Sequence, residues 1–201
     1  IGKKPQIDKA LFLSKYIAKK NDHFDQGNRE ILNPFFKLGS HEADGIGQTN
    51  REIDCVIHLS KKSRVNVNKL AKELEGINFL FHAENSLLDE MLGDGELRQN
   101  HSYQQGGHGT EQKLFENTKL FVDMTDLSFN PHCFKAMSAG VAVYIPQDVY
   151  GELIPNEFSM RYLNNVDIKE ALECSWWEQF EPSKARRQAL RLNGRIFKRS
   201  L

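Results

Sequence analysis

Residues 134–143 read FKAMSAGVAV, and this stretch joins a predicted helix to a predicted strand. Ala136 and Ala139 are small residues that let the helix lie close to a sheet. Gly140 follows the helix directly, where glycine takes the left-handed backbone conformation without a Cβ clash. The apolar residues that come next predict a buried strand. The stretch therefore predicts a tight helix–strand junction of the kind found in doubly wound α/β folds.

The same alternation extends upstream of this junction. Apolar runs predict strands at residues 53–59, 77–82, 119–124 and 141–145. Helical patterns lie between or beside them at residues 67–75, 86–92, 111–117 and 131–139, and a polar, glycine-rich loop is predicted at 93–109. Such alternation predicts a Rossmann-like parallel sheet with helices on both faces. Ligands of these sheets bind at the carboxyl ends of the strands.

The two ends of the chain have different patterns. Apolar spacing in residues 7–20 predicts a helix, and turn signals fill residues 21–51. We therefore expect a loop-rich connecting region over residues 1–52 and one Rossmann-like domain over residues 53–201. Basic and apolar residues alternate in residues 184–199 at helical spacing, which predicts an amphipathic C-terminal helix. Its charges are expected to face solvent, with peripheral contact to anionic lipid as the alternative.

Composition excludes some classes of protein. Lys+Arg and Asp+Glu each number 27, so the formal net charge is +0, which argues against a nucleic-acid partner. No apolar run approaches the roughly 20 residues that span a bilayer, and a cytoplasmic location is expected. The three cysteines are widely spaced and form no CxxC pair, so reduced thiols are expected.

Histidine spacing does not predict a metal site. The seven histidines include no HxxxH or HxH pair. His82 and Glu84 stand at the end of a predicted strand, on the edge where ligands bind. General acid–base chemistry is one interpretation of this pair, and capping of the strand end is the other.

Four segments resemble one known family. FKAMSAGVAV is similar to the L-E-A-M-A-x-G-V-P-V signature of retaining GT-B glycosyltransferases. FENTKLFV (115–122), DVYGELI (148–154) and NVDIKEAL (165–172) resemble its Y-x-x-A-D-V-F-V, D-V-G-G-x-x-E-x-I and D-x-x-x-L-A-x-A-I segments, in the same order. The resemblance implies the C-terminal, nucleotide-sugar-binding half of such an enzyme. A complete enzyme has two Rossmann-like domains, and 201 residues are too few for both, so a second domain or subunit is implied.

The glutamate motif of the family is degenerate in this chain. Lys135 stands where the family has a glutamate that accepts hydrogen bonds from ribose hydroxyls, and a lysine has no acceptor. Asp126 lies one residue from the place of the family's second glutamate. The resemblance implies that Asp126 and Glu152 lie near the sugar, as candidate catalytic residues.

Two further segments are expected to bind the nucleotide. The family has an arginine and a lysine after its first strand. His58 stands at the arginine position, while Lys62 and Arg64 flank the lysine position. Lys61, Lys62 and Arg64 are expected to face a diphosphate, and an ordinary solvated loop is the alternative. Lys135 is also expected among the residues that bind the nucleotide sugar.

The second of these segments is the glycine-rich run QQGGHGT at residues 104–110. The resemblance implies that Gly107, Gly109 and Thr110 lie near the base, and a flexible connector is the alternative.

Three functions remain open from the sequence. The first is transfer of a sugar from a nucleotide sugar to an acceptor glycan, lipid or protein, with no cofactor besides this donor. The second is a catalytically inert binding or scaffold module, which Lys135 favours. The third is cleavage of N-glycosidic bonds, because VDMTD (122–126) followed by NPH (130–132) resembles the A-D-L-T-x-x-N-P-N-V run of nucleoside deoxyribosyltransferase-like and TIR-like domains.

Overall fold

A computed structural model gives the architecture of the chain. It describes residues 10–12, 29–31, 51–63, 65–93, 95–103, 111–125, 130–147, 154, 156–162, 166–174 and 180–195, and the side chains among them from residue 51 to residue 189. Among these residues, no helix is both long and apolar enough to cross a membrane.

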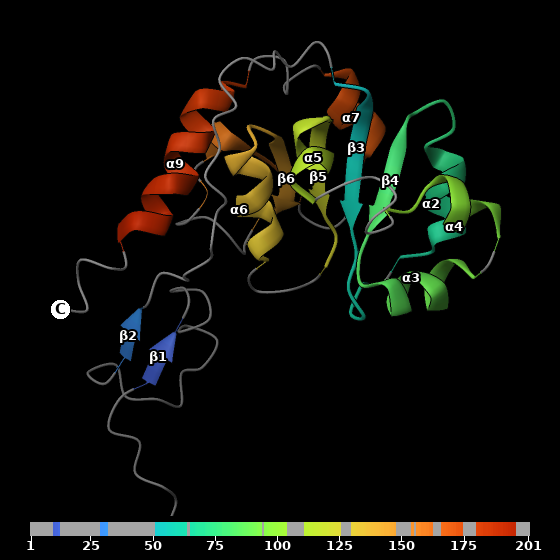
Figure 1. Cartoon of the computed structure of the whole chain (residues 1–201), viewed down its shortest axis with the longest axis horizontal. Coiled ribbons are helices and arrows are strands. Elements are labelled where there is room, and N and C mark those ends of the chain that lie inside the picture. Colours follow the sequence, from blue (N-terminus) through green and yellow to red (C-terminus); the bar gives the residue numbers. More distant parts are fainter. Residues whose placement is uncertain are drawn as a thin grey trace, which may run out of the picture.

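Five parallel strands form the main sheet (Figure 1). They are β3 (Ile53–His58), β4 (Phe79–His82), β5 (Thr118–Asp123), β6 (Ala142–Pro146) and β7 (Ser159–Tyr162). Their order across the sheet is β4-β3-β5-β6-β7, and each neighbouring pair is parallel. The predicted fold class, a Rossmann-like α/β sheet, is confirmed. Because β4 lies on one side of β3 and all later strands on the other, the chain changes direction across the sheet between β3 and β5.

Helices cover both faces of this sheet. In Figure 1, α5 and α6 lie in front of the strands and α7 lies behind them. The helices are α2 (Val67–Glu73), α3 (Asn85–Leu92), α4 (Glu96–Asn100), α5 (Glu111–Glu116), α6 (Pro131–Ser138), α7 (Ile168–Glu173) and α9 (Pro182–Arg195), with a 3-10 turn η3 (Asn156–Phe158).

Short polar side chains begin three of these helices. Asn66, Asn130 and Asp167 stand at the N-caps of α2, α6 and α7, and each accepts a hydrogen bond from a backbone N–H of the first turn. Such caps satisfy N–H groups that have no partner within the helix. Pro131 follows Asn130 at the first helical position, where its missing N–H does no harm.

The core is built from the middle of the central strands and from α6. Completely buried side chains include Cys55, Val56, Ile57, Leu120, Phe121, Val122, Ala142, Val143, Ala136 and Met137. Strands buried on both faces carry continuous apolar runs of this kind. Gly140 has φ +73°, so the left-handed helix end predicted from the sequence is confirmed.

A buried arginine fixes the junction between α6 and β6. Arg51 donates to the carbonyl oxygens of Thr118 at 2.5 Å, Gly140 at 3.0 Å and Ala139 at 3.3 Å. Burial, together with the nearby Arg186, lowers the pKa of Arg51 to about 10, and Glu116 opposes this shift. The C-terminal carbonyls of α6 are therefore satisfied by a side chain that precedes β3.

The structure corrects three local predictions. Within residues 7–20, Ala10–Phe12 form a strand, β1, which pairs in parallel with β2 (Arg29–Ile31), so the helix predicted there is wrong in its described part. A short apolar run fits helix and strand equally well, and pairing decides between them. Helix α4 lies inside the predicted loop 93–109, in the helix-favouring run ELRQN.

The third correction concerns β7, which the sequence did not predict. This edge strand reads SMRY and buries only its first residue, so it lacks a long apolar run. Helix α9, by contrast, confirms the predicted C-terminal helix over its described length and packs against α6.

Candidate functional site

The carboxyl ends of three neighbouring strands bring polar side chains together. His58 ends β3, and in the register of the sheet it lies beside His82 of β4 and Asp123 of β5. The strand order reverses between β3 and β5, and in open α/β sheets such a switch point leaves a crevice where ligands bind. The sheet topology thus marks this edge as the candidate site.

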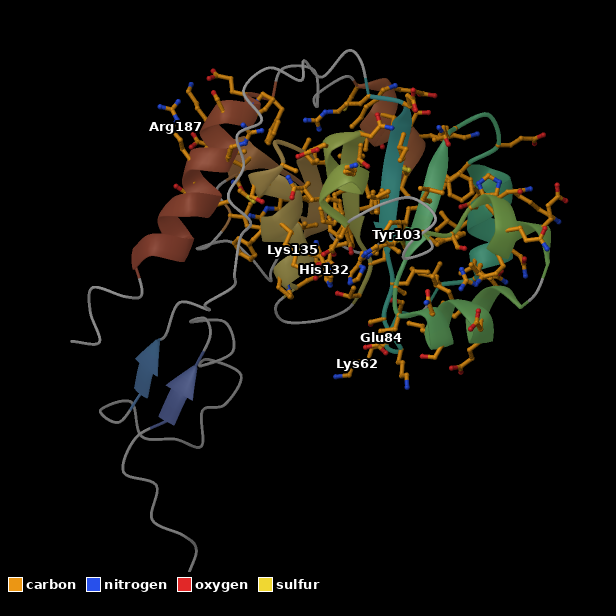
Figure 2. The ribbon with its side chains drawn as sticks, viewed as in Figure 1. Lys62, Glu84, Tyr103, His132, Lys135 and Arg187 are labelled. Atoms are coloured by element: carbon orange, nitrogen blue, oxygen red, sulfur yellow. The ribbon has the colours of Figure 1, made fainter. Side chains whose placement is uncertain are left out.

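The loop after β3 is held to the segment after β5. The hydroxyl groups of Ser60 and Ser63 donate to backbone carbonyls of residues 124–125. Lys61 and Lys62 lie between these two serines, and both side chains are exposed. Figure 2 shows Lys62 at the edge toward which the strands point. Two of the cations predicted to face a diphosphate therefore lie on a fixed loop beside the switch point.

Asp123 organises the start of α6. Its buried carboxylate accepts hydrogen bonds from the backbone N–H of Thr125 at 3.1 Å, from the hydroxyl of Thr125 at 2.7 Å and from the amide of Asn130 at 2.9 Å. The Cys133 thiol lies 3.6 Å from its second oxygen. In turn, the Asn130 side chain accepts from the backbone N–H of His132. Asp123 therefore places His132 at the ligand-binding edge.

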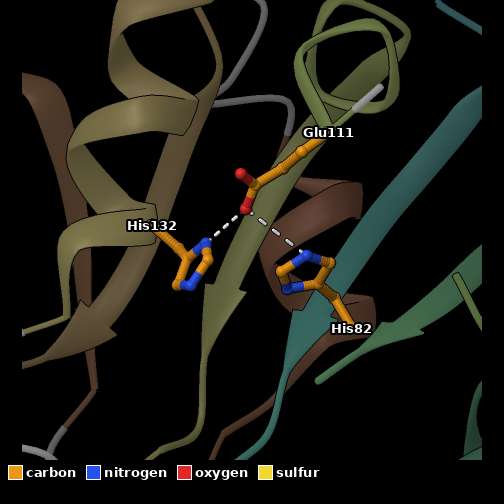
Figure 3. Close-up of side chains that lie close together, drawn as sticks. All are labelled: His82, Glu111 and His132. Atoms are coloured by element: carbon orange, nitrogen blue, oxygen red, sulfur yellow. Dashed lines mark hydrogen bonds and ion pairs between the residues drawn. The ribbon is translucent and has the colours of Figure 1, made fainter. Parts of the chain in front are cut away.

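Glu111 lies at the centre of a cluster of basic side chains (Figure 3). Its Oε1 atom forms a hydrogen bond with Nδ1 of His132 and lies 3.5 Å from Nε2 of His82. Its Oε2 atom accepts a hydrogen bond of 2.7 Å from the Lys135 ammonium. The carboxylate thus joins residues of β4 and α6 from its position at the start of α5.

A second pair of histidines completes the cluster. The Nδ1 atoms of His58 and His82 lie 2.6 Å apart, within hydrogen-bonding distance. The rings of His58 and His132 have their centroids 4.4 Å apart. Three imidazoles are thus in mutual contact at the switch point.

Burial and these contacts set the charge of the cluster. Burial, together with the neighbouring His82 and His132, lowers the pKa of His58 to about 2. Burial and His132 lower the pKa of His82 to about 4. Burial raises the pKa of Glu111, but hydrogen bonds from His132 and Lys135 outweigh this effect and bring it to about 2. At neutral pH the two buried histidines are therefore uncharged and Glu111 is a carboxylate.

The structure places only part of the predicted site. Lys61 and Lys62 are on the switch-point loop, and Lys135 is paired with Glu111. The other predicted residues lie outside the described part of the chain, and their roles stay predictions: Arg64, Gly107, Gly109, Thr110, Asp126 and Glu152.

The sequence did not point to Glu111 or His132. The sequence pairs His82 with Glu84, but the partners of His82 come from separate elements, His58 from β3 and Glu111 from α5, so no spacing motif links them. Glu84 begins α3 without a side-chain capping bond. The one available signal was position, because Glu111 and His132 each stand at the start of a helix.

Comparison with known proteins places the fold. No protein family matches the sequence, and no curated protein matches it. Among solved structures, the chain resembles TarM, with 18% identity, a TM-score of 0.62 and coverage of 96% of this chain and 43% of that one. It resembles the pneumococcal O-GlcNAc transferase GtfA, solved with UDP and GlcNAc, with 14% identity, a TM-score of 0.57 and coverage of 96% and 44%.

A third similar structure is WaaG, a glycosyltransferase involved in lipopolysaccharide biosynthesis. It matches with 15% identity, a TM-score of 0.54 and coverage of 96% of this chain and 59% of that one. The chain therefore spans about half the length of the structures that it matches. This likeness shows the fold: the chain has the architecture of one half of a GT-B glycosyltransferase.

Proposed function

We propose that this chain is the nucleotide-sugar-binding half of a glycosyltransferase. The observation that carries the proposal is the switch point between β3 and β5, where the exposed Lys61 and Lys62 stand on a loop fixed to the neighbouring strand end. The fold likeness to GtfA, which was solved with UDP and GlcNAc, supports it.

The diphosphate of the donor lies against the loop after β3 in this proposal. Phosphoryl oxygens accept hydrogen bonds from lysine and arginine, and Arg64 is the third cation assigned to them. Lys135, assigned to the same ligand by the sequence, has its charge balanced by Glu111. Its contribution to phosphate binding is therefore smaller than that of the exposed lysines.

The remaining parts of the donor are assigned to the other predicted residues. Gly107, Gly109 and Thr110 lie near the base, and Asp126 and Glu152 lie near the sugar. The chemistry is substitution at the anomeric carbon of the sugar. The bond from that carbon to the diphosphate oxygen breaks, a bond to an acceptor oxygen forms, and the acceptor gives up a proton.

In this proposal, the acceptor binds to a second domain or subunit. The chain spans about half the length of the similar structures, and the proposed donor site occupies its sheet edge. A glycan, a lipid or a protein is the acceptor class. The basic helix α9 is available for peripheral contact with anionic lipid, since side chains such as Arg187 are exposed on it (Figure 2).

An inert binding module is the second candidate function. One observation favours it: Lys135 occupies the position of the family's ribose-binding glutamate and is held in an ion pair with Glu111. Such a module binds the nucleotide sugar without transferring the sugar. Binding and turnover must therefore be measured separately.

Calorimetric and thermal-shift titrations test the proposal. The ligands are UDP, GDP, UDP-glucose and GDP-mannose, with NAD and deoxynucleosides to test the N-glycosidic alternative. A ligand that binds the native state raises its melting temperature. We expect a sugar nucleotide to bind and the Lys61→Ala/Lys62→Ala double variant to bind it at least about tenfold more weakly, a loss of about 1.4 kcal/mol.

Lys69→Ala is the matched control, because Lys69 is an exposed lysine on α2 whose partner is Glu73. Its affinity for the nucleotide should equal that of the wild type. Folded protein that responds to none of the nucleotides would rule out the proposal. A response to deoxynucleosides or NAD alone would replace it with the N-glycosidic function.

A further inference from the structure

His82, Glu111 and His132 form a potential metal site. Each offers one ligand atom, and the three atoms lie within 4.8 Å of one another. They come from β4, α5 and α6, and they meet at the carboxyl edge of the sheet (Figure 3). We propose that these side chains bind a divalent transition-metal ion of the zinc class.

One pair of ligand atoms already has the spacing of a zinc site. Zinc lies about 2.0–2.2 Å from nitrogen and oxygen ligands, so neighbouring ligand atoms in a tetrahedral site are about 3.3 Å apart. Nε2 of His82 and Oε1 of Glu111 are 3.5 Å apart. His132 forms a hydrogen bond with the same oxygen, so its ring must turn outward by about 1 Å to admit the ion, and its side chain is 26% exposed.

Two of the ligands have partners that orient them for this role. A histidine that binds a metal through one ring nitrogen usually donates the N–H of the other. Nδ1 of His82 faces Nδ1 of His58 at 2.6 Å, which leaves its Nε2 lone pair directed at the site. Lys135 holds Oε2 of Glu111 at 2.7 Å, and this contact turns Oε1 toward the two imidazoles.

The ligand types select the metal. Two imidazoles and one carboxylate suit zinc, nickel or copper, whereas magnesium and calcium prefer sites made of oxygen alone. Three protein ligands leave the fourth position of a tetrahedral site for water or an anion, as in catalytic rather than structural zinc sites. Glu111 and His132 are only partly buried, which gives the ion a path from solvent.

Isothermal titration of the full chain with Zn²⁺ alone tests the inference. We expect binding of one ion per chain. Glu111→Gln and His132→Ala should each weaken it by more than about 100-fold, since even loss of an outer-shell partner weakens metal binding by 10–100-fold. Both side chains are partly exposed, so these variants are expected to fold, and circular dichroism checks that they do.

Two control variants test whether zinc binding is specific to the proposed site. His101→Asn removes a histidine that stacks on Phe79 outside the cluster, and zinc affinity should be unchanged. Cys174→Ser removes the exposed thiol, and binding should survive it. The proposal would be overturned if the wild type did not bind zinc, or if Glu111→Gln and His132→Ala bound zinc as tightly as the wild type. Because the probe is the metal alone, this result is independent of the nucleotide titration.

Discussion

The Nδ1 atoms of His58 and His82 lie 2.6 Å apart at the ends of adjacent parallel strands. For a hydrogen bond between them, one nitrogen must carry a proton and the other must not. Both rings are buried, so neither gains from becoming charged. Burial therefore favours the state in which both imidazoles are neutral, and protonation of both rings would break the hydrogen bond.

We expect acid to destabilise the fold through this pair. The pKa values of His58 and His82 are lowered from 6.5 to about 2 and about 4 by burial and by neighbouring histidines, including His132; Glu111 opposes this shift in both, and Lys135 adds to it in His82. Between pH 6.5 and 4 the unfolded state binds more protons than the native state. The free energy of unfolding should therefore decrease as the pH is lowered, by up to about 1.4 kcal/mol per pH unit for each group.

Urea unfolding between pH 7.5 and 4.5, in the presence of EDTA, measures this slope. His58→Asn removes one of the titrating groups and should flatten the profile. An equally steep profile in His58→Asn would contradict the assignment.

The contact between Glu111 and Lys135 should show a measurable coupling energy. The two side chains are 27% and 35% exposed, so solvent screens part of their attraction, and we expect a coupling of about 1 kcal/mol. A double-mutant cycle with Glu111→Gln and Lys135→Gln measures it from unfolding free energies at pH 7. The exposed pair Lys184–Glu181 provides the comparison and should give less than about 0.5 kcal/mol. Equal couplings would contradict this expectation.

Arg51→Met should be strongly destabilising. Arg51 donates to three backbone carbonyls around the end of α6, and methionine leaves them without this partner. An unsatisfied buried polar group costs about 1–3 kcal/mol, so a loss of about 3 kcal/mol in the free energy of unfolding is expected. Arg187→Met, at an exposed position of α9, is the control and should change it by less than about 0.5 kcal/mol.

Gly140→Ala should destabilise the protein more than Gly76→Ala. Both glycines have positive φ, at +73° and +85°, so alanine is strained at either position by about 1–2 kcal/mol. An added Cβ at Gly140 would also lie 2.8 Å from Cβ of Pro182, whereas at Gly76 it would meet nothing within 4 Å. The difference in melting temperature between the two variants isolates this clash, and equal shifts would show that α9 moves aside freely.

The fold was predictable because local signals and tertiary packing agree at β3, β4, β5 and β6 and at the helices between them, apart from α4. Apolar runs such as those of β3 and β5 are buried on both faces, and Gly140 ends α6 as its sequence indicates. The agreement fails where pairing decides the conformation. The run that contains β1 fits a helix as well as a strand, and β7 lies at the edge of the sheet with a mixed sequence.

The candidate site was less predictable than the fold. The edge of the sheet follows from topology, and the lysines of the loop after β3 were expected there. The cluster around Glu111 was not predicted, because His82 and His132 contact Glu111 from separate elements, and no sequence motif spans these elements. Only three-dimensional packing shows that Lys135 has a carboxylate partner.

The strand order also determines how this chain acquires its structure during synthesis. β3 is made before the other strands of the five-stranded sheet, yet it lies between β4 and β5 and needs both as partners. No neighbouring pair is antiparallel, so no tight hairpin completes the sheet early. A chain stalled between β4 and β5 exposes one edge of the apolar strand β3 to other chains. Until β5 is made, the nascent protein therefore has an open strand edge through which it can aggregate.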